Sequence, residues 1–335
     1  MHGDELIDVH AHFTTDRYIR AAKARGRREP DGMPEAYWPQ WDANTHLALM
    51  DEAGIARAIL SVSSPGVHFG DDKEARALAH EVNETGARIT QEHPGRFGYF
   101  ASLPLPDIDG ALTEIPHAFE DLHAFEDLHA DGVILMTNSA GLYLGDKRMR
   151  PVLSELDQRG SIAFLHPTSC AGHEALALGY PRPMIEFLFD AARSVVDLIL
   201  SGAAQRYPRI RFIVPHAGGV LPLLADRLEL FRAIAGDADG PTVAPALARF
   251  YYDLAGTPTD RQLNALTSVA GPDHLLYGSD YAWTRYEQVL RAIEALDAVA
   301  PPFGQSWRRR TTRNAHRLLG THRRDAKESS AVPER

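Results

Sequence analysis

The sequence predicts a (β/α)8 TIM barrel with a long insertion after the first strand. Eight short apolar runs alternate with stretches of helical pattern, which is the element count of this barrel. Most of the runs are continuous rather than alternating, which is typical of parallel strands buried on both faces. An open doubly wound sheet is the alternative. It is less favoured because no glycine-rich dinucleotide fingerprint follows an early strand.

The predicted elements follow one another in barrel order. Apolar, β-leaning runs predict strands at Leu6–Val9, Ala58–Val62, Phe97–Ala101, Gly132–Met136, Ile162–Leu165, Arg211–Pro215, Phe250–Leu254 and Leu275–Gly278. Helical patterns between them include Asn44–Ala53, Asp71–Gln91 and Met184–Ser201. We expect one barrel domain over residues 1–320. The polar, non-periodic residues 321–335 are expected to form a flexible C-terminal tail.

The insertion after the first strand spans Thr14–Pro39 and is rich in arginine, proline and aromatic residues. Long loops in compact domains tend to be lids or binding loops, and this one lies where a barrel has its active-site face. Trp38 and Trp41, the second just beyond the insertion, could form an aromatic lid. Packing against the barrel rim is the commoner fate of such residues.

A tandem repeat precedes the fourth strand, since residues 117–122 and 123–128 both read HAFEDL. Six residues turn a helix by about 600°, so the two copies cannot present the same face to the barrel. We expect a partly extruded duplication with no catalytic role. Its neighbourhood contains three histidines that we expect to face solvent: His117, His123 and His129.

Composition narrows the class of protein. The chain has 335 residues, and its formal net charge of −10 argues against a nucleic-acid partner, which would need a basic surface. Cys170 is the only cysteine, so no intrachain disulfide is possible. No signal peptide is recognisable, and no apolar run approaches the ~18 residues of a membrane helix. We expect a soluble cytoplasmic protein.

Polar residues with metal-binding atoms appear where predicted strands stop. His10 and His12 close the first strand two residues apart, so their side chains point to the same side. His166 ends the fifth strand, His216 the sixth and Asp280 the eighth. An isolated His-x-His is weak and is more often a surface pair, but all five residues fall at strand ends of one layout. Three imidazoles and a carboxylate suit Zn²⁺ or a similar divalent ion.

These residues and their surroundings resemble the amidohydrolase superfamily, in its amidohydrolase-2 branch of metal-dependent decarboxylases. The resemblance covers nearly the whole chain, and the 6-methylsalicylate decarboxylase-like group is most similar. The segments that carry it are Asp8–His12, Ser63–Gly70, Thr137–Asp146, His166–Ser169, Gly179–Phe187, Val214–Gly219 and Tyr277–Tyr281.

The resemblance implies a role for each matching residue. It implies that the metal ligands are His10, His12, His166 and Asp280. His216 matches the active-site histidine that acts as acid or base, and Asp280 shares the catalytic role. In related decarboxylases an arginine eleven residues after this histidine reaches the substrate carboxylate of the neighbouring subunit. Arg227 is eleven residues after His216 and matches that arginine. The resemblance thus implies a homodimer.

The implied reaction is the non-oxidative decarboxylation of a small ortho-hydroxybenzoate. Residues 29–46 contain no arginine, unlike aminocarboxymuconate-type relatives, which favours a mono-acid substrate. One divalent ion suffices, Zn²⁺ before Mn²⁺, and no organic cofactor is needed because no redox step occurs. The ligand set fits a mononuclear lactonase, esterase or hydratase as well. A binuclear site is disfavoured because no predicted strand carries a lysine. The non-enzyme alternative is a barrel that binds a metal structurally or binds a small aromatic acid as a sensor.

Three further residues are candidates for substrate binding. Asn138 follows the fourth strand and could hydrogen-bond the substrate, although a turn-capping role is equally expected. His68 and Phe69 follow the second strand and could line the pocket or pack in the loop. Cys170 is expected to be a bystander, because the proposed reaction needs no thiolate.

Overall fold

Eight parallel strands form a closed barrel in the computed structural model, which describes residues 5–119, 129–236, 240–256, 260–299 and 306–329. The strands follow chain order: β1 (Leu6–His12), β2 (Ile55–Ser61), β3 (Phe97–Ser102), β4 (Gly132–Met136), β7 (Ile162–His166), β8 (Arg211–Val214), β9 (Tyr251–Asp253) and β10 (Leu275–Leu276). The amide of Val9 donates to the carbonyl of Tyr277 at 3.0 Å, which joins the last strand to the first. The predicted TIM barrel is confirmed.

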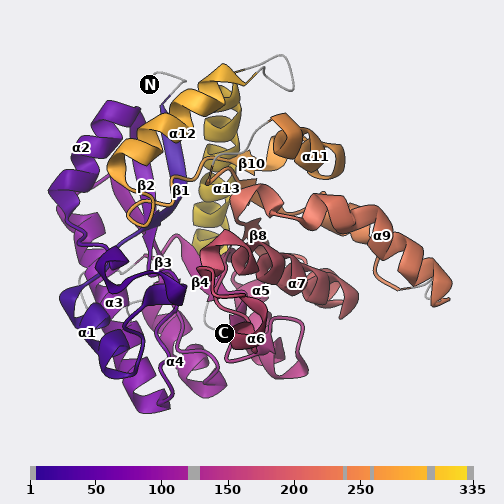
Figure 1. The fold of residues 1–335 in the computed structure, drawn as a ribbon, viewed down its shortest axis with the longest axis horizontal. Helices are drawn as coiled ribbons and strands as arrows, with labels where there is room; N and C mark the ends of the chain where they lie inside the picture. The colour runs from indigo at the N-terminus through magenta and orange to yellow at the C-terminus, as the bar shows by residue number, and fades with distance from the viewer. Residues whose placement is uncertain (1–4, 120–128, 237–239, 257–259, 300–305, 330–335) are drawn as a thin grey trace.

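Helices surround the strands in the ring that a TIM barrel requires (Figure 1). The longer ones are α1 (Asp16–Ala24), α2 (Ala43–Ala53), α3 (Asp72–Glu92), α4 (Ile108–Phe119), α5 (Arg150–Gln158), α7 (Glu186–Leu200), α9 (Leu221–Ile234), α11 (Asp260–Ala270), α12 (Tyr286–Ala298) and α13 (Trp307–Ser329). Shorter elements include α6 (His173–Leu176), α8 (Ala203–Arg206), α10 (Val243–Leu247) and the hairpin of β5 (Asn138–Ser139) with β6 (Leu142–Tyr143). Figure 1 shows α9 projecting away from the rest of the molecule.

The last helix closes the floor of the barrel. Ala315, Leu318 and Leu319 of α13 belong to the same buried apolar cluster as the inward-facing strand residues, among them Ile59 and Phe164. Polar contacts fix the helix at the starts of three strands: Thr312 with Glu5, Asn314 with Leu275, and Arg211 with Leu318. Because the floor is sealed, only the opposite, C-terminal face of the barrel can admit a ligand.

A bulge in β1 turns its histidines inward. Ile7 and Val9 belong to the interior cluster, so strict alternation would also send Ala11 inward. The pairing with β2 instead slips between Asp8 and Ala11, and Ala11 packs in the outer cluster beneath the helices. The extra residue changes the alternation at this point. His10 and His12 therefore reach the barrel mouth.

Two predicted irregular segments contain helix. The insertion Thr14–Pro39 begins with α1, whose Thr15 side chain accepts a hydrogen bond from the Tyr18 amide as an N-cap. In the expected tail, α13 continues to Ser329 and residues 330–335 lie outside the described part, so its flexibility stays a prediction. Within the described residues, no helix has the length and apolarity to cross a membrane.

Candidate metal centre

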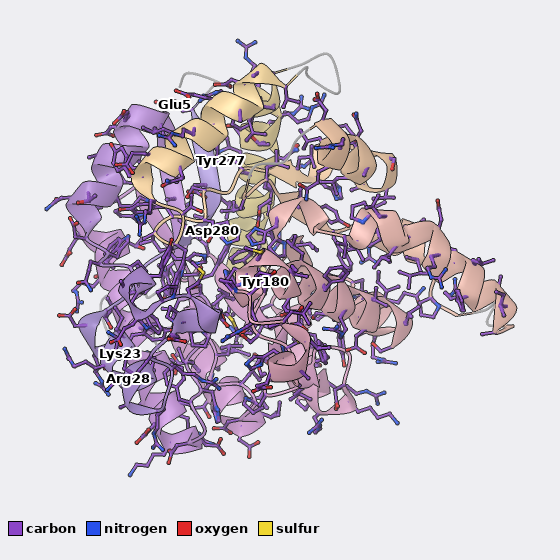
Figure 2. The ribbon with its side chains drawn as sticks, in the orientation of Figure 1. Glu5, Lys23, Arg28, Tyr180, Tyr277 and Asp280 are labelled. Atoms are coloured by element: carbon purple, nitrogen blue, oxygen red, sulfur yellow. The ribbon has the colours of Figure 1, made fainter. Side chains whose placement is uncertain are left out.

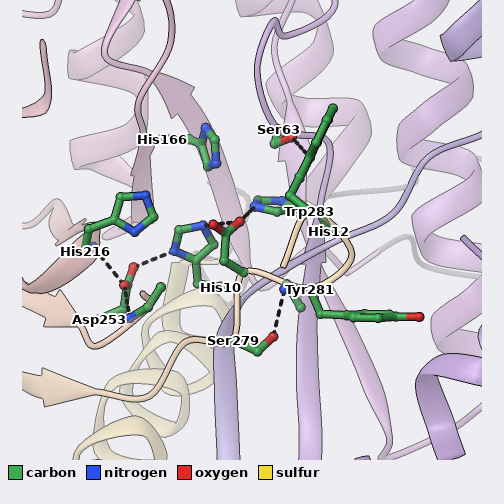
Figure 3. A network of polar contacts seen from close by, with 12 residues as sticks. His10, His12, Ser63, His166, His216, Asp253, Ser279, Tyr281 and Trp283 are labelled. Carbon is green, nitrogen blue, oxygen red and sulfur yellow. Dashed lines mark hydrogen bonds and ion pairs between the residues drawn. The ribbon is translucent and has the colours of Figure 1, made fainter. Parts of the chain in front are cut away.

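Four side chains with metal-binding atoms converge where barrel strands end, and Figure 3 shows the rings of three of them, His10, His12 and His166. His10 and His12 end β1, His166 ends β7, and Asp280 lies just beyond β10. One ligand atom from each of the four lies within 4.8 Å of those of the others. Asp280 Oδ1 is 3.2 Å from His12 Nε2 and 3.5 Å from His10 Nε2. Figure 2 shows Asp280 near the middle of the molecule, far from Lys23 and Arg28 of the insertion.

The donor set fits a divalent cation. Within the described residues, His10 Nε2 and His12 Nε2 are buried and face the Asp280 carboxylate without a well-aligned hydrogen bond. Leaving polar atoms buried without partners is costly, and an ion between these nitrogens and the Asp280 carboxylate would satisfy them. Nitrogen and carboxylate donors are those that Zn²⁺ and related ions take, with a position left for substrate.

The second ring nitrogens of His12 and His166 are held in place by other groups. His12 Nδ1 lies 3.0 Å from Ser61 Oγ, and His166 Nδ1 lies 2.7 Å from the Pro167 carbonyl oxygen. A protonated Nδ1 that donates to an oxygen leaves Nε2 free as an electron-pair donor. Both rings are therefore oriented as metal-bound histidines are.

Asp253, the last residue of β9, orients His10 and was not predicted as a site residue. Its Oδ2 lies 2.9 Å from His10 Nδ1, and its Oδ1 accepts hydrogen bonds from the amides of His216 (3.0 Å) and Ala255 (2.9 Å). The only signal in the sequence is an acidic residue at the end of a predicted apolar strand. These contacts hold the His10 ring and the backbone at His216 and Ala255 in place, so we interpret Asp253 as a positioning residue.

The seam between β1 and the segment after β10 is packed too tightly for a side chain. Asp8 Oδ1 accepts hydrogen bonds at 3.0 Å from the amides of His10 and Ser279. A Cβ atom added to Gly278 would lie 2.7 Å from His10 Cβ and 3.2 Å from Asp253 Cβ. Glycine is therefore required at position 278 for His10 to occupy its place.

His216 lies beside the four candidate ligands. Its ring stacks on that of His10, with the centroids 5.1 Å apart and an interplanar angle of 25°. His216 Nδ1 is buried without a hydrogen-bond partner, so it is free to exchange a proton with a bound molecule. The backbone there has φ of +53° at His216 and +52° at Ala217, and Asp280 has +57°. Such conformations cost about 1–3 kcal/mol each and cluster at functional sites.

Burial and mutual charge set the protonation states of the ligands. Burial lowers the pKa of His12, and it lowers that of His166 far more, helped there by the neighbouring histidines. Burial would raise the pKa of Asp280, but hydrogen bonds and charge from His10 and His12 hold it well below its usual range. Neutral imidazoles beside an ionised carboxylate are the forms that bind a cation.

His10 and Asp253 behave as a charged pair in the metal-free protein. Burial lowers the pKa of His10, yet the carboxylates of Asp253 and Asp280 outweigh it and raise this pKa to about 10. Burial likewise opposes the charge of Asp253, whose pKa is nevertheless lowered by His10. An incoming cation must therefore displace a proton from His10.

A cavity of about 370 Å³ opens onto the centre, and His166, His216 and Asp280 line it. Its other walls are largely apolar: Pro30, Met33, Tyr37, Pro183, Phe187, Leu188 and Trp283. Pro30, Met33 and Tyr37 come from the insertion, which therefore covers the site as predicted for a binding loop. A volume of this size suits a small molecule in an apolar setting with few polar contacts.

None of the four predicted substrate residues is among the described residues that line this cavity. His68, Phe69 and Asn138 line a neighbouring cavity of about 430 Å³, which shares the wall of Pro30 and Asp31 with the first. The amide of Asn138 is engaged by Asp190, Ser169 and Gly141. Its contacts are those of a residue that shapes a loop, and a substrate role for these three residues stays a prediction.

The remaining candidates lie away from the centre. Arg227 is exposed on α9, where its guanidinium lies 4.8 Å from the Phe231 ring. Trp38 is buried and packs against Tyr18 and Trp283, so it supports the rim instead of forming a mobile flap. Trp41 packs against Phe13 and His46.

The expectation for the HAFEDL repeat is corrected at its first residue. His117 is half-buried and stacks on His80, with ring centroids 4.0 Å apart, so it does not face solvent. It lies three residues after the buried Glu114 and hence on the face of α4 that meets α3. His129 is exposed as expected, whereas residues 120–128, including His123, lie outside the described residues.

The chain belongs to the amidohydrolase family, whose sequence profile matches residues 7–321. This agrees with the resemblance noted from the motifs. A 6-methylsalicylic acid decarboxylase from Penicillium expansum is 33% identical over 303 residues, which cover 88% of this chain and 90% of that protein.

Solved structures give the same classification. A crystal structure described as an amidohydrolase II matches with a TM-score of 0.86 at 33% identity, over 94% of this chain and 99% of that chain. A dihydroxybenzoic acid decarboxylase from Polaromonas sp. JS666, solved with manganese and the inhibitor 2-nitroresorcinol, shares the fold with a TM-score of 0.80 at 20% identity. That match covers 98% of this chain and 100% of the other.

Proposed function

We propose that this protein is a carboxy-lyase, a metal-dependent non-oxidative decarboxylase of a small aromatic acid. The ortho-hydroxybenzoates, with 6-methylsalicylate as the first member to test, are the proposed substrate class. The observation that carries the proposal is the convergence of His10, His12, His166 and Asp280 at one small, mostly apolar cavity. The 33% identical decarboxylase from Penicillium expansum supports the choice of reaction.

The ion would be held by His10, His12, His166 and Asp280. When bound, it supplies Lewis acidity that draws the substrate carboxylate and ortho hydroxyl into place. The apolar walls, Phe187 and Trp283 among them, orient the ring and exclude bulk water.

Protonation of the ring carbon that carries the carboxylate is the chemical step the chain must provide. Asp280 is ionised at the outset, so a proton that it delivers must first be taken up, and the ortho hydroxyl of the substrate can supply it. A water held by Nδ1 of His216 is the alternative donor. Once the carbon is protonated, the bond to the carboxylate breaks, carbon dioxide leaves and aromaticity returns.

The identity of the ion is part of the proposal. We propose Zn²⁺ because three imidazoles and one carboxylate match its preferred donors. The manganese-bound structural neighbour from Polaromonas favours Mn²⁺ instead. Activity of the metal-free protein after addition of one equivalent of each ion decides between them, together with metal analysis of the purified enzyme.

The decisive experiment measures carbon dioxide release from 6-methylsalicylate and 2,6-dihydroxybenzoate before and after chelation. We expect turnover that chelation abolishes and that the ion restores, with little turnover of 2-methylbenzoate, which differs from 6-methylsalicylate only in lacking the ortho hydroxyl. Full activity after complete metal removal would contradict the mechanism. Turnover of lactones or esters without release of carbon dioxide would assign the site to the hydrolytic alternative, which the ligand set equally permits.

We further propose that two subunits pair through the region of α9. Arg227 is exposed there, next to apolar side chains that water surrounds in the single chain: Leu223, Leu230, Phe231 and Ile234. A second subunit would cover this surface. Arg227 of each subunit would then reach the cavity at the candidate metal centre of the other subunit, whose described lining has no arginine or lysine.

Subunit mixing tests this pairing. Arg227→Ala and His216→Asn should each be weakly active alone. Unfolding and refolding them together should restore up to about a quarter of wild-type activity, because half of the dimers carry one intact site. A monomeric mass in light scattering, or no gain on mixing, would overturn the shared site.

A further inference from the structure

A second group of metal-binding side chains lies outside the barrel, between α3 and α4. His80 comes from α3, and Glu114 and His117 come from α4. One ligand atom of each lies within 4.8 Å of the other two. None of the three lines the cavity at the barrel mouth, and the proposed reaction uses none of them. We propose that His80, Glu114 and His117 bind one Zn²⁺ ion, which ties α3 to α4.

The spacing of the side chains approaches that of a zinc site. His80 Nδ1 lies 3.5 Å from Glu114 Oε2, and the rings of His80 and His117 lie 4.0 Å apart at an angle of 23°. Neighbouring ligand atoms around a tetrahedral ion with bonds of about 2.0–2.1 Å are about 3.3 Å apart. The His80–Glu114 distance is already close to this spacing, whereas the stacked rings of His80 and His117 must rotate to direct their nitrogens at a common ion.

Neighbouring groups already hold Glu114 in position. Glu114 Oε1 accepts a hydrogen bond of 2.7 Å from Asn83 Nδ2, which leaves Oε2 directed at His80. Asn83 is fixed in turn by Ser102 at the end of β3, whose amide donates to Asn83 Oδ1 at 2.8 Å. Such outer partners orient the ligands of metal sites and raise their affinity.

His80 has a similar outer partner. Its Nε2 lies 3.6 Å from Glu84 Oε1, one turn further along α3. A carboxylate at that nitrogen favours the tautomer in which Nδ1 is free to bind the ion. The His80 side chain is 47% exposed, so an ion has a path from solvent and a water can complete the coordination.

Burial of this cluster leaves a ring nitrogen of His117 without a hydrogen-bond partner in the described part of the chain and a carboxylate largely shielded from water. Among the residues that the structure describes, His117 Nε2 is buried without a hydrogen-bond partner, while the Glu114 carboxyl is almost completely buried. A cation would pair with both groups at once. Two imidazoles and one carboxylate favour Zn²⁺ over Mn²⁺ and Mg²⁺, which prefer sets made mostly of oxygen.

Counting bound zinc tests the proposal, because the two sites can be removed separately. Metal-free protein is given two equivalents of Zn²⁺, desalted and analysed for metal. We expect two ions in the wild type, one in Glu114→Gln or His117→Gln, one in Asp280→Asn, and none in Asp280→Asn combined with His117→Gln. His316→Gln, which removes an exposed histidine of α13, is the matched control and should keep both ions.

Two further readouts separate metal binding from a purely structural role. Glu114→Gln keeps the shape of the side chain and an oxygen for Asn83, so it should fold and retain decarboxylase activity with the barrel site filled. In the Asp280→Asn background, Zn²⁺ should raise the melting temperature and should fail to do so once His117 is replaced. Equal zinc content in His117→Gln and His316→Gln would overturn the proposal, whatever the outcome for the decarboxylase reaction.

Discussion

Asp253 Oδ2 lies 2.9 Å from His10 Nδ1, although the two residues are 243 positions apart in the chain. The contact joins β9 to β1 and leaves Nε2 of His10 directed at the candidate metal site. Because the same carboxylate also accepts the amide of His216, one buried group positions both a metal ligand and the proposed acid or base.

Replacing Asp253 with asparagine should weaken metal binding by about 10- to 100-fold, the usual cost of losing a partner of a ligating histidine. Asparagine keeps the shape of the side chain but removes the negative charge that makes Nε2 of His10 a stronger electron-pair donor to the ion. Competition with a chromophoric chelator measures the change. Asp297→Asn, which removes an exposed carboxylate paired with Arg308, should leave the affinity unchanged. Wild-type affinity in Asp253→Asn would refute the positioning role.

When the metal-free protein binds the ion at about pH 6.5, it should release one proton, which comes from His10. The pKa of His10 is raised to about 10 in the metal-free protein, so His10 is protonated at that pH and must lose its proton to bind the ion. The apparent affinity should therefore rise about tenfold for each unit of increasing pH below that pKa. Calorimetry in two buffers with different ionisation enthalpies counts the protons. An affinity that is independent of pH would contradict the charged state of His10.

Gly278→Ala should displace His10 of β1 and so weaken metal binding at the candidate centre. The new methyl group would lie 2.7 Å from His10 Cβ, so His10 or the chain must shift. Overpacking of this kind costs about 1–3 kcal/mol and would lower both the melting temperature and the metal content. Gly320→Ala is the control, since none of the described heavy atoms lies within 4 Å of its added Cβ. Equal behaviour of the two variants would show that the seam tolerates a side chain.

His216→Asn should separate catalysis from metal binding. The ring lies beside the ion site without belonging to the four proposed ligands, so we expect full metal content. The catalytic constant should fall about 10²- to 10⁴-fold, the range for loss of a general acid or base. Metal analysis and steady-state kinetics on one preparation test both parts. A parallel loss of the ion would instead make His216 a ligand.

Much of the barrel could be predicted because its signals are local. Each of the eight barrel strands overlaps an apolar run that the sequence predicted, and β4 matches Gly132–Met136 at both ends. The short hairpin of β5 and β6 was not predicted. The convergence of the four candidate ligands could be predicted because strand ends share one edge of a barrel, so residues remote in sequence are brought together. That they bind a metal ion stays a prediction.

The remaining features depend on contacts that sequence spacing does not encode. The bulge that turns His10 inward arises from pairing with β2, and the role of Asp253 arises from a residue at the other end of the chain. His117 was misjudged because the repeat was read as extruded, while α4 packs this residue against α3. The start of α1 does have a local signal, because Thr15 is a typical N-cap residue directly before the helix.

The closure of the barrel by its two ends has a consequence for biosynthesis. His12 leaves the ribosome roughly 270 residues before Asp280, a delay of tens of seconds at about 5–20 residues per second. The floor helix α13 emerges later still. A nascent chain therefore carries histidines that no partner yet orients, and the cell can load the ion only once translation is almost finished.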